Sequence, residues 1–367
     1  MCVRQLLSIA IASVAFPLFA PGVLIAEHNI SFASDDTTPV PVLFDTDICG
    51  DVDDVLALAM LHALADRGEC DILAVTVSRP HRLGPVMVDA INTFYGRPSI
   101  PIALTRLAPD RDSNYLDLVT RQDGGEFRYP HDLIDGRATP SAVELMRRTL
   151  ADSPRNGIKI VQVGLATNTA ALLRSPADDI SPLSGEALIR DKVAELHVMA
   201  GAFEPIDGEP NYREANVRNH VEPMAFLATH WPRNVPIIWS GFEVGRALPY
   251  PRGSIRDDFS IREHHIVREA YLRHSGPDHD RPTWDLTSVL EAVRPNRGYF
   301  ERSQPGTVSV DAAGATRFTA TSPNTGKTNK DSPPPRDRIL VVPQGGTPRI
   351  IEAMRTLVSQ PPQRSID

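Results

Sequence analysis

Short apolar segments alternate with helix-like segments along most of this chain, and this alternation restricts the possible fold more than any other feature. Strands are predicted at 40–44, 72–77 and 100–104, with helices at 55–65 and 86–95 between them. The same alternation continues with helices at 142–150, 168–173 and 224–229 and strands at 158–163, 193–199 and 235–239. Short apolar strands separated by helices are typical of a mostly parallel sheet with helices on both faces. The sequence therefore predicts an α/β fold of this kind.

The C-terminal part of the chain adds a different element. Helices are predicted at 261–273 and 286–292, and residues 307–320 alternate like a β-hairpin with Ala313-Gly314 at its turn. A polar loop closed by the prolines at 333–335 precedes a strand at 339–342 and a final helix at 348–358. We therefore expect a C-terminal β-hairpin beside the parallel sheet, within one domain that spans residues 39–367.

The first segment has the character of a targeting signal. After Arg4, residues 6–26 are nearly all apolar, with breaks at Pro17 and Pro21, and the polar stretch 27–38 follows. This pattern predicts a signal peptide at 1–26 and a flexible mature N-terminus at 27–38, with an uncleaved membrane anchor as the alternative. The protein is then expected to be secreted or periplasmic, with no membrane association once the signal is removed.

The charge balance excludes several classes of partner. The chain has 38 Lys and Arg against 46 Asp and Glu, a net charge of −8, and its basic residues are scattered. This composition argues against binding a nucleic acid polymer or an anionic membrane through charge. With three cysteines in 367 residues, the fold cannot rest on a disulfide framework. A small molecule is the expected partner.

Acidic residues gather at the end of the first predicted strand. That strand leads directly into a ten-residue segment that holds five carboxylates: Asp45, Asp47, Asp51, Asp53 and Asp54. Their mutual repulsion calls for a cation, and ligands that are all oxygen suit Ca²⁺ or Mg²⁺. The alternative is a solvated acidic cap on helix 55–65, which accounts for Asp53 or Asp54 but hardly for all five. Ligands of such sheets bind beyond the carboxyl ends of the strands, where this cluster lies.

Two known loop patterns fit this segment only in part. An EF-hand loop starting at Asp45 finds its glycine at Gly50, but Cys49 and Leu56 stand where ligands are needed. A phosphohydrolase of the haloacid dehalogenase type also begins with Asp-x-Asp after a first strand. That pattern leaves the pair Asp53 and Asp54 without a role.

A third pattern fits the segment better. Residues 42–58 resemble the amino-terminal signature of the inosine-uridine nucleoside hydrolase family, in which Asp-x-Asp, a short loop and Asp-Asp build a Ca²⁺ site. Further motifs follow in family order. The segments 163–168 and 199–201 resemble the family's Gly-x-Leu-Thr-Asn turn and its Met-Gly-Gly, while 214–216 and 284–285 resemble its Glu-Phe-Asn and its His-Asp pair. Together they span about residues 40–292.

The resemblance implies an activity and a set of site residues. The domain would be a catalytic one with the Rossmann-like architecture of nucleoside hydrolases, and a homo-oligomer by analogy with family members. Asp47, Asp54, Asp285 and the backbone carbonyl of Thr167 would hold Ca²⁺, and Asp47 would deprotonate a water bound to it. Because cleavage of an N-glycosidic bond builds positive charge on the sugar, nearby carboxylates also favour the reaction. The substrate would be held by four further side chains: Asp53, Glu214 and Asn216 at the ribose, and Trp284.

This chain also departs from the family's pattern. The loop between Asp47 and Asp53 is two residues longer than usual, so Asp51 competes for the role given to Asp53. The asparagine that touches ribose from the second strand is absent from 76–81. Trp284 replaces the histidine that protonates the leaving base in some members, and an indole has no transferable proton. Two histidines on the adjacent loop, His274 and His279, could approach the base.

The sequence thus predicts a hydrolase that cleaves ribonucleosides or related N-ribosides into free base and ribose. Two alternatives stay open at this point. One is a Mg²⁺-dependent phosphohydrolase of the haloacid dehalogenase type. The other is a relative that binds nucleosides or sugars and has lost catalysis, and the tryptophan at position 284 is the feature that supports it.

Overall fold

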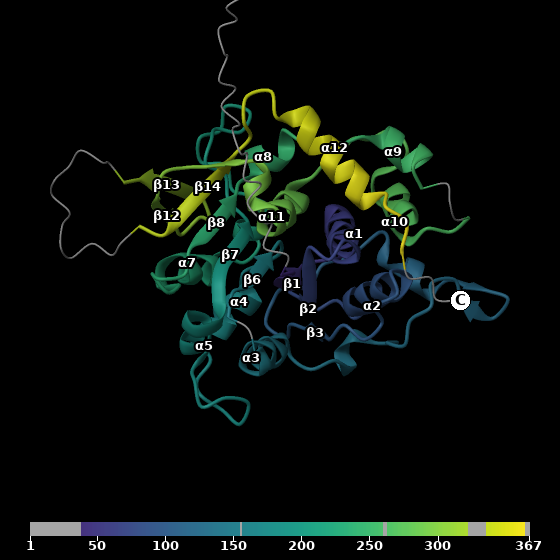
Figure 1. Ribbon diagram of the computed structural model, residues 1–367, viewed down its shortest axis with the longest axis horizontal. Coiled ribbons are helices and arrows are strands. Elements are labelled where there is room, and N and C mark those ends of the chain that lie inside the picture. The colour runs from purple at the N-terminus through teal and green to yellow at the C-terminus, as the bar shows by residue number, and fades with distance from the viewer. Residues whose placement is uncertain (1–37, 155, 260–262, 322–334, 364–367) are drawn as a thin grey trace, which may run out of the picture. The chain divides into compact units, whose positions relative to one another are not determined.

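Most strands of the described residues form one large sheet. A computed structural model describes residues 38–154, 156–259, 263–321 and 335–363. The ten-stranded sheet has the order β13-β12-β14-β8-β7-β6-β1-β2-β3, with β11 paired to β14 (Figure 1). The strands are β1 (Val40–Thr46), β2 (Cys70–Val77), β3 (Ile102–Leu104), β6 (Ile158–Gln162), β7 (Val193–Met199), β8 (Ile237–Ser240), β11 (Glu301–Arg302), β12 (Gly306–Val310), β13 (Thr316–Ala320) and β14 (Asp337–Val341).

Most neighbouring strands of this sheet are parallel. Pairing is parallel from β3 through β2, β1, β6, β7 and β8 to β14. The predicted hairpin exists as β12 and β13, which pair antiparallel, with Thr307 opposite Thr319. It extends the sheet because β12 also pairs with β14 at Gly306. The predicted α/β class with a mostly parallel sheet is therefore confirmed, together with the C-terminal hairpin.

Helices cover both faces of the sheet (Figure 1). Alternate residues of β1 explain the two layers, because Val42 and Phe44 enter one apolar core and Leu43 enters the other. One core is built with α1 (Asp53–Asp66), α2 (Gly84–Phe94), α10 (Ile266–Ser275), α11 (Trp284–Val293) and α12 (Thr347–Val358). The other is built with α3 (Ala142–Asp152), α4 (Thr167–Arg174), α5 (Gly185–Lys192) and α7 (Val221–His230).

Helix α1 is buried on every side, which the sequence did not predict. All twelve residues from Asp53 to Leu64 are buried, and α11, α12, α10 and α2 surround the helix next to the sheet. A helix with apolar residues all round belongs inside a protein. As a consequence, the two carboxylates in its first turn, Asp53 and Asp54, are buried with it.

Several short elements complete the fold. They are the helices α6 (Ala215–Arg218), α8 (Phe242–Arg246) and α9 (Arg252–Asp257), the 3₁₀ turns η1 (Leu116–Thr120), η2 (Gly136–Ala138) and η3 (Pro295–Arg297), and the paired strands β4 (Gln122–Asp123) with β5 (Glu126–Phe127) and β9 (Pro249–Tyr250) with β10 (Arg281–Pro282). None of them was predicted from sequence.

Some predictions fall on residues that the structure does not describe. The signal peptide at 1–26 and nearly all of the flexible segment 27–38 lie outside the described residues, as does most of the proline-closed loop at 333–335. The helix predicted at 261–273 starts later, at Ile266, and continues to Ser275. Among the helices of the described ranges, not one has the length and apolar character required to cross a membrane.

Candidate active site

One cavity collects all the predicted site residues except Thr167 at the carboxyl ends of the parallel strands. Its volume is about 250 Å³, slightly below the range of roughly 300–1,000 Å³ that is usual for drug-sized ligands. It therefore suits one small ligand. Its walls are formed by Asp47, Gly50, Asp51, Asp53, Asp54, Arg111, Val163, Met199, Tyr212, Glu214, Ala215, Asn216, Arg218, Asn219, Phe242, Arg281, Trp284 and Asp285.

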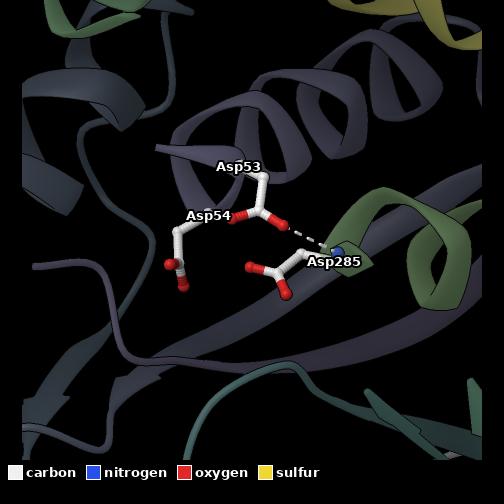
Figure 2. Close-up of side chains that lie close together, drawn as sticks. All are labelled: Asp53, Asp54 and Asp285. Carbon is white, nitrogen blue, oxygen red and sulfur yellow. Dashed lines mark hydrogen bonds between the residues drawn. The ribbon is translucent and has the colours of Figure 1, made fainter. Parts of the chain in front are cut away.

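Three buried carboxylates face one another in this cavity. Asp53 and Asp54 come from the first turn of α1 and Asp285 from the first turn of α11 (Figure 2). Each offers an oxygen within 4.8 Å of the others. Burial, together with the charges of neighbouring aspartates, raises the pKa of all three well above its ordinary value. Negative groups brought this close in a buried place are compensated by a cation, so the cluster fits a metal ion bound through oxygen.

Backbone and hydroxyl donors fix the orientation of this cluster. Asp54 Oδ1 accepts the backbone N–H of Asp47 at 3.1 Å and the hydroxyl of Thr46. Asp53 Oδ2 accepts the backbone N–H of Asp285 at 3.1 Å, which joins the starts of α1 and α11 (Figure 2). The sequence assigned Asp53 to ribose alone. The structure instead places it beside Asp54 and Asp285.

Asp47 lies in the same cavity but has a partner of its own. Its Oδ2 accepts a hydrogen bond from Arg79 Nε at 3.1 Å, and the Arg79 side chain is 3% exposed. Arg79 follows β2, where the family's ribose-binding asparagine was missing. Burial raises the pKa of Asp47, while the charge of Arg79 opposes this shift. Asp47 is therefore held beside the three-carboxylate cluster and not within it.

Asp51 is engaged outside the cluster. Arg281 Nε donates to its Oδ1 at 2.9 Å, and Arg281 Nη2 donates to its Oδ2. Burial alone would raise the pKa of Asp51, but the hydrogen bonds and charge of Arg281 outweigh it and lower the pKa. Of the two competing aspartates, the geometry thus favours Asp53 for contact with ribose or metal.

Thr167 does not line the cavity, in contrast to what the resemblance implied. It is the first residue of α4, so its carbonyl points along the helix toward the amide four residues later. Its hydroxyl pairs with His220 Nδ1 at 2.8 Å. Val163, at the carboxyl end of β6, lines the cavity in its place. The Val163 carbonyl accepts a hydrogen bond from Asn216, and the Thr167 carbonyl as a metal ligand stays a prediction.

The side chains of Glu214 and Asn216 are both buried. Glu214 caps α6 by accepting the amides of Asn216 at 2.8 Å and Val217 at 3.3 Å, and it also accepts the amide of Gly201 at 3.1 Å. Burial raises its pKa to about 7. Asn216 Nδ2 donates to the carbonyls of Val163 at 2.7 Å and Met199 at 3.0 Å. The Asn216 Oδ1 atom remains to accept a hydrogen bond from a ligand hydroxyl.

Three aromatic side chains, Tyr212, Phe242 and Trp284, form an aromatic wall of the cavity. The ring of Trp284 lies 5.2 Å from that of Phe242, and Tyr212 packs on Phe242 at 4.8 Å. Trp284 Nε1 donates to the Phe242 carbonyl at 2.9 Å, so the indole is fixed and its N–H is already used. A planar base fits against such a wall.

Neither candidate histidine lines this cavity. His274 belongs to α10 and not to a loop, and its Nε2 lies 4.0 Å from Asp51 Oδ1 while its ring packs edge-on to Tyr115. His279 is exposed. Sequence reasoning missed Arg79, Arg111 and Arg281 as site residues, although Arg79 lies in the segment 76–81 that lacks the family's asparagine and Arg281 lies three residues before Trp284.

Comparison with known proteins agrees with this geometry. Residues 42–341 match the family described as inosine-uridine preferring nucleoside hydrolase. No curated protein matches the sequence. A plant nucleoside hydrolase, PpNRh1, superimposes with a TM-score of 0.65 at 19% identity, covering 88% of this chain and 100% of that one.

Two further solved structures are similar to this chain. An inosine-guanosine nucleoside hydrolase gives a TM-score of 0.64 at 18% identity, over 87% of this chain and 98% of its own. An inosine-uridine preferring nucleoside hydrolase from Bacillus anthracis gives 0.62 at 17% identity, over 87% and 99%. At these identities the superpositions establish a shared fold. Because the family match spans most of the sequence, the chain belongs to the inosine-uridine preferring nucleoside hydrolase family, whose members are enzymes that hydrolyse N-glycosidic bonds.

Proposed function

We propose that this protein hydrolyses the N-glycosidic bond of ribonucleosides or closely related N-ribosides, releasing free base and ribose. The observation that carries the proposal is one cavity lined both by buried carboxylates and by aromatic side chains. A sugar that gains positive charge fits beside the carboxylates and a planar base fits against the aromatic side chains. Because the chain belongs to the nucleoside hydrolase family, we no longer consider the alternative of a phosphohydrolase.

Each residue of the cavity has its own role in the proposed reaction. Asp54 and Asp285 would hold a Ca²⁺ ion, and Asp53 lies close enough to join them. The resemblance implies Asp47 and the Thr167 carbonyl as further oxygen ligands. The chemistry that such an ion would supply at this site is contact with the ribose hydroxyls and a lower pKa of a water molecule. Asp47 accepts the proton of the attacking water, and Arg79 orients the Asp47 carboxylate. Glu214 and Asn216 accept hydrogen bonds from ribose hydroxyls.

A panel of nucleosides tests this proposal directly. The purified protein is incubated with purine and pyrimidine ribonucleosides in the presence of Ca²⁺, and free base and free ribose are measured by chromatography. We expect equal amounts of base and ribose from at least one substrate. Tight binding without release of either product would instead identify a non-catalytic nucleoside-binding relative.

Replacing Trp284 tests the aromatic wall. Because stacking on an aromatic side chain contributes about 1–3 kcal/mol per base in nucleic acid sites, Trp284→Ala should lower kcat/KM for purine ribosides about 5- to 150-fold. Trp284→His would add a proton donor and should raise the rate for poor leaving groups such as uracil in uridine. If Trp284→Ala instead lowers kcat/KM by the same factor on every substrate and also lowers the melting temperature, Trp284 only packs against Phe242 and orients Asp285.

We also propose that the protein is exported. The support is the apolar run 6–26 followed by the polar segment 27–38. Mass spectrometry of the protein recovered outside the cytoplasm should find an N-terminus near residue 27. An intact Met1 in the membrane fraction would indicate an uncleaved anchor.

A further inference from the structure

Arg281 occupies the boundary between the two halves of the cavity. Its guanidinium donates to both oxygens of Asp51 on the carboxylate side. The same guanidinium lies 5.3 Å from the centroid of the Trp284 ring on the aromatic side, within the range of a cation–π contact. A ligand with its sugar on the carboxylates and its base on the aromatic wall has its glycosidic bond at this boundary.

Contacts on several sides hold Arg281 in place. Its side chain is 23% exposed, and Asp51, which it grips with two hydrogen bonds, is 27% exposed. Asp51 is itself fixed, since its Oδ1 accepts the amide of Val52 at 2.7 Å and its carbonyl accepts the Tyr115 hydroxyl at 2.7 Å. A fixed cation that is partly shielded from water stabilises developing negative charge more strongly than a mobile, solvated one.

The cavity wall holds no histidine among the described residues, and its tryptophan cannot transfer a proton. Cleavage of the C1′–N bond leaves the electron pair on the base nitrogen, so negative charge develops there unless a proton arrives at the same time. Arginine stays protonated at physiological pH and acts as a charge and hydrogen-bond donor, not as an acid.

We propose that Arg281, held by Asp51, stabilises the leaving base as an anion, in place of a proton donor. The inference rests on the proposed nucleoside hydrolysis. The water oxygen forms the new bond to C1′, Asp47 accepts one water proton, and the base departs with the electron pair of the broken bond. The base then takes a proton from solvent, and Asp47 returns its proton to solvent. Asp51 is a positioning residue in this scheme.

The test compares substrates whose leaving groups differ in how much stabilisation they need. Inosine and uridine release bases that are poor leaving groups, whereas p-nitrophenyl riboside releases a stable anion. Removing one preorganised donor from a developing anion typically costs about 100- to 1,000-fold in rate. Arg281→Gln should therefore lower kcat/KM for inosine and uridine by about 100-fold or more, and for p-nitrophenyl riboside by less than about threefold.

Further variants separate this role from a structural one. Arg281→Lys keeps the charge and should recover part of the activity on nucleosides. Asp51→Asn keeps Arg281 but weakens the hydrogen bonds that hold it. This variant should show the same preference for p-nitrophenyl riboside, with a smaller decrease of kcat/KM on nucleosides. The matched control is Arg355→Gln, which removes another arginine that grips one aspartate, Asp258, outside the cavity. It should change neither rate.

One outcome would contradict the role of Arg281, and a different one would contradict the proposed hydrolysis. If Arg281→Gln or, should that variant not fold, Asp51→Asn lowers the rate by the same factor on all three substrates, Arg281 does not stabilise the leaving group. If the unaltered protein cleaves neither nucleosides nor p-nitrophenyl riboside, the proposed hydrolysis itself is wrong. The unaltered protein thus tests the function, and the ratio of the two substrate types tests Arg281.

Discussion

Asp47→Asn is expected to lower kcat for nucleoside hydrolysis at least about 100-fold, the usual size of a general-base contribution. Asparagine keeps the shape of the side chain and can still accept a hydrogen bond from Arg79, but it cannot accept a proton from water. Because Asp47 follows β1 and lines the cavity beside the carboxylate cluster, removing its charge affects the reaction more than the fold. Single-turnover kinetics would measure the chemical step without product release.

A matched variant separates this effect from a general loss of charge. Asp123→Asn removes an aspartate that also pairs with an arginine, Arg128, on the exposed hairpin of β4 and β5. It should retain full activity. If Asp47→Asn stays folded and keeps most of its turnover, the base is another group. Asp53 is then the first candidate for the base, since both oxygens of Asp51 already accept hydrogen bonds from Arg281.

The predicted strands and helices were close to those of the structure because each depends on local patterning. Residues 193–199 form a strand with the predicted bounds, and β1 extends the prediction by two residues, to Thr46. Asp47, Asp53 and Asp54 were identifiable for a similar reason, since one short segment carries them. Asp285 required the family resemblance, because nothing in the local sequence shows that α11 packs against the start of α1.

Long-range packing decided the parts of the site that sequence could not predict. Arg281 reaches Asp51 across 230 residues of chain, and Arg79 reaches Asp47 across 32. The Thr167 carbonyl, which the resemblance implied as a metal ligand, is not part of the cavity wall, because a motif shows which residues are near one another but not where β6 ends and α4 begins. The elongated loop after Asp47 was visible in the sequence. The sequence did not show the consequence of this longer loop, which is that Asp51 pairs with Arg281.

Removing the proposed Ca²⁺ ion is expected to lower the melting temperature by an amount on the order of 5–10 °C. A ligand that binds only the folded state at a thousand times its Kd stabilises that state by about 4 kcal/mol. Each kcal/mol shifts the melting temperature of a domain of 150–250 residues by roughly 2–4 °C, and somewhat less in a larger one. Without the ion, Asp53, Asp54 and Asp285 would remain buried beside one another, so the folded state would lose the charge that compensates them.

Metal analysis of the purified protein should find about one Ca²⁺ per chain, which the ligand preference of carboxylates and carbonyls favours. Calorimetry with and without a chelator then measures the shift, and adding Ca²⁺ back should restore the melting temperature. The proposed site would be contradicted if the protein holds only zinc, or no ion, and if the chelator does not change its melting temperature.

Asp285→Asn sharpens this test because its effect should change sign with the ion. With Ca²⁺ present the variant has lost a ligand, so it should melt below the unaltered protein and respond less to the chelator. After chelation it has one buried negative charge fewer, so it should melt at the same temperature as the unaltered protein or above it. Asp123→Asn, whose carboxylate lies outside the cavity, should respond to the chelator as the unaltered protein does. Lower stability of Asp285→Asn under both conditions would mean that Asp285 is needed for packing at the start of α11, and that the carboxylate cluster does not depend on an ion for its stability.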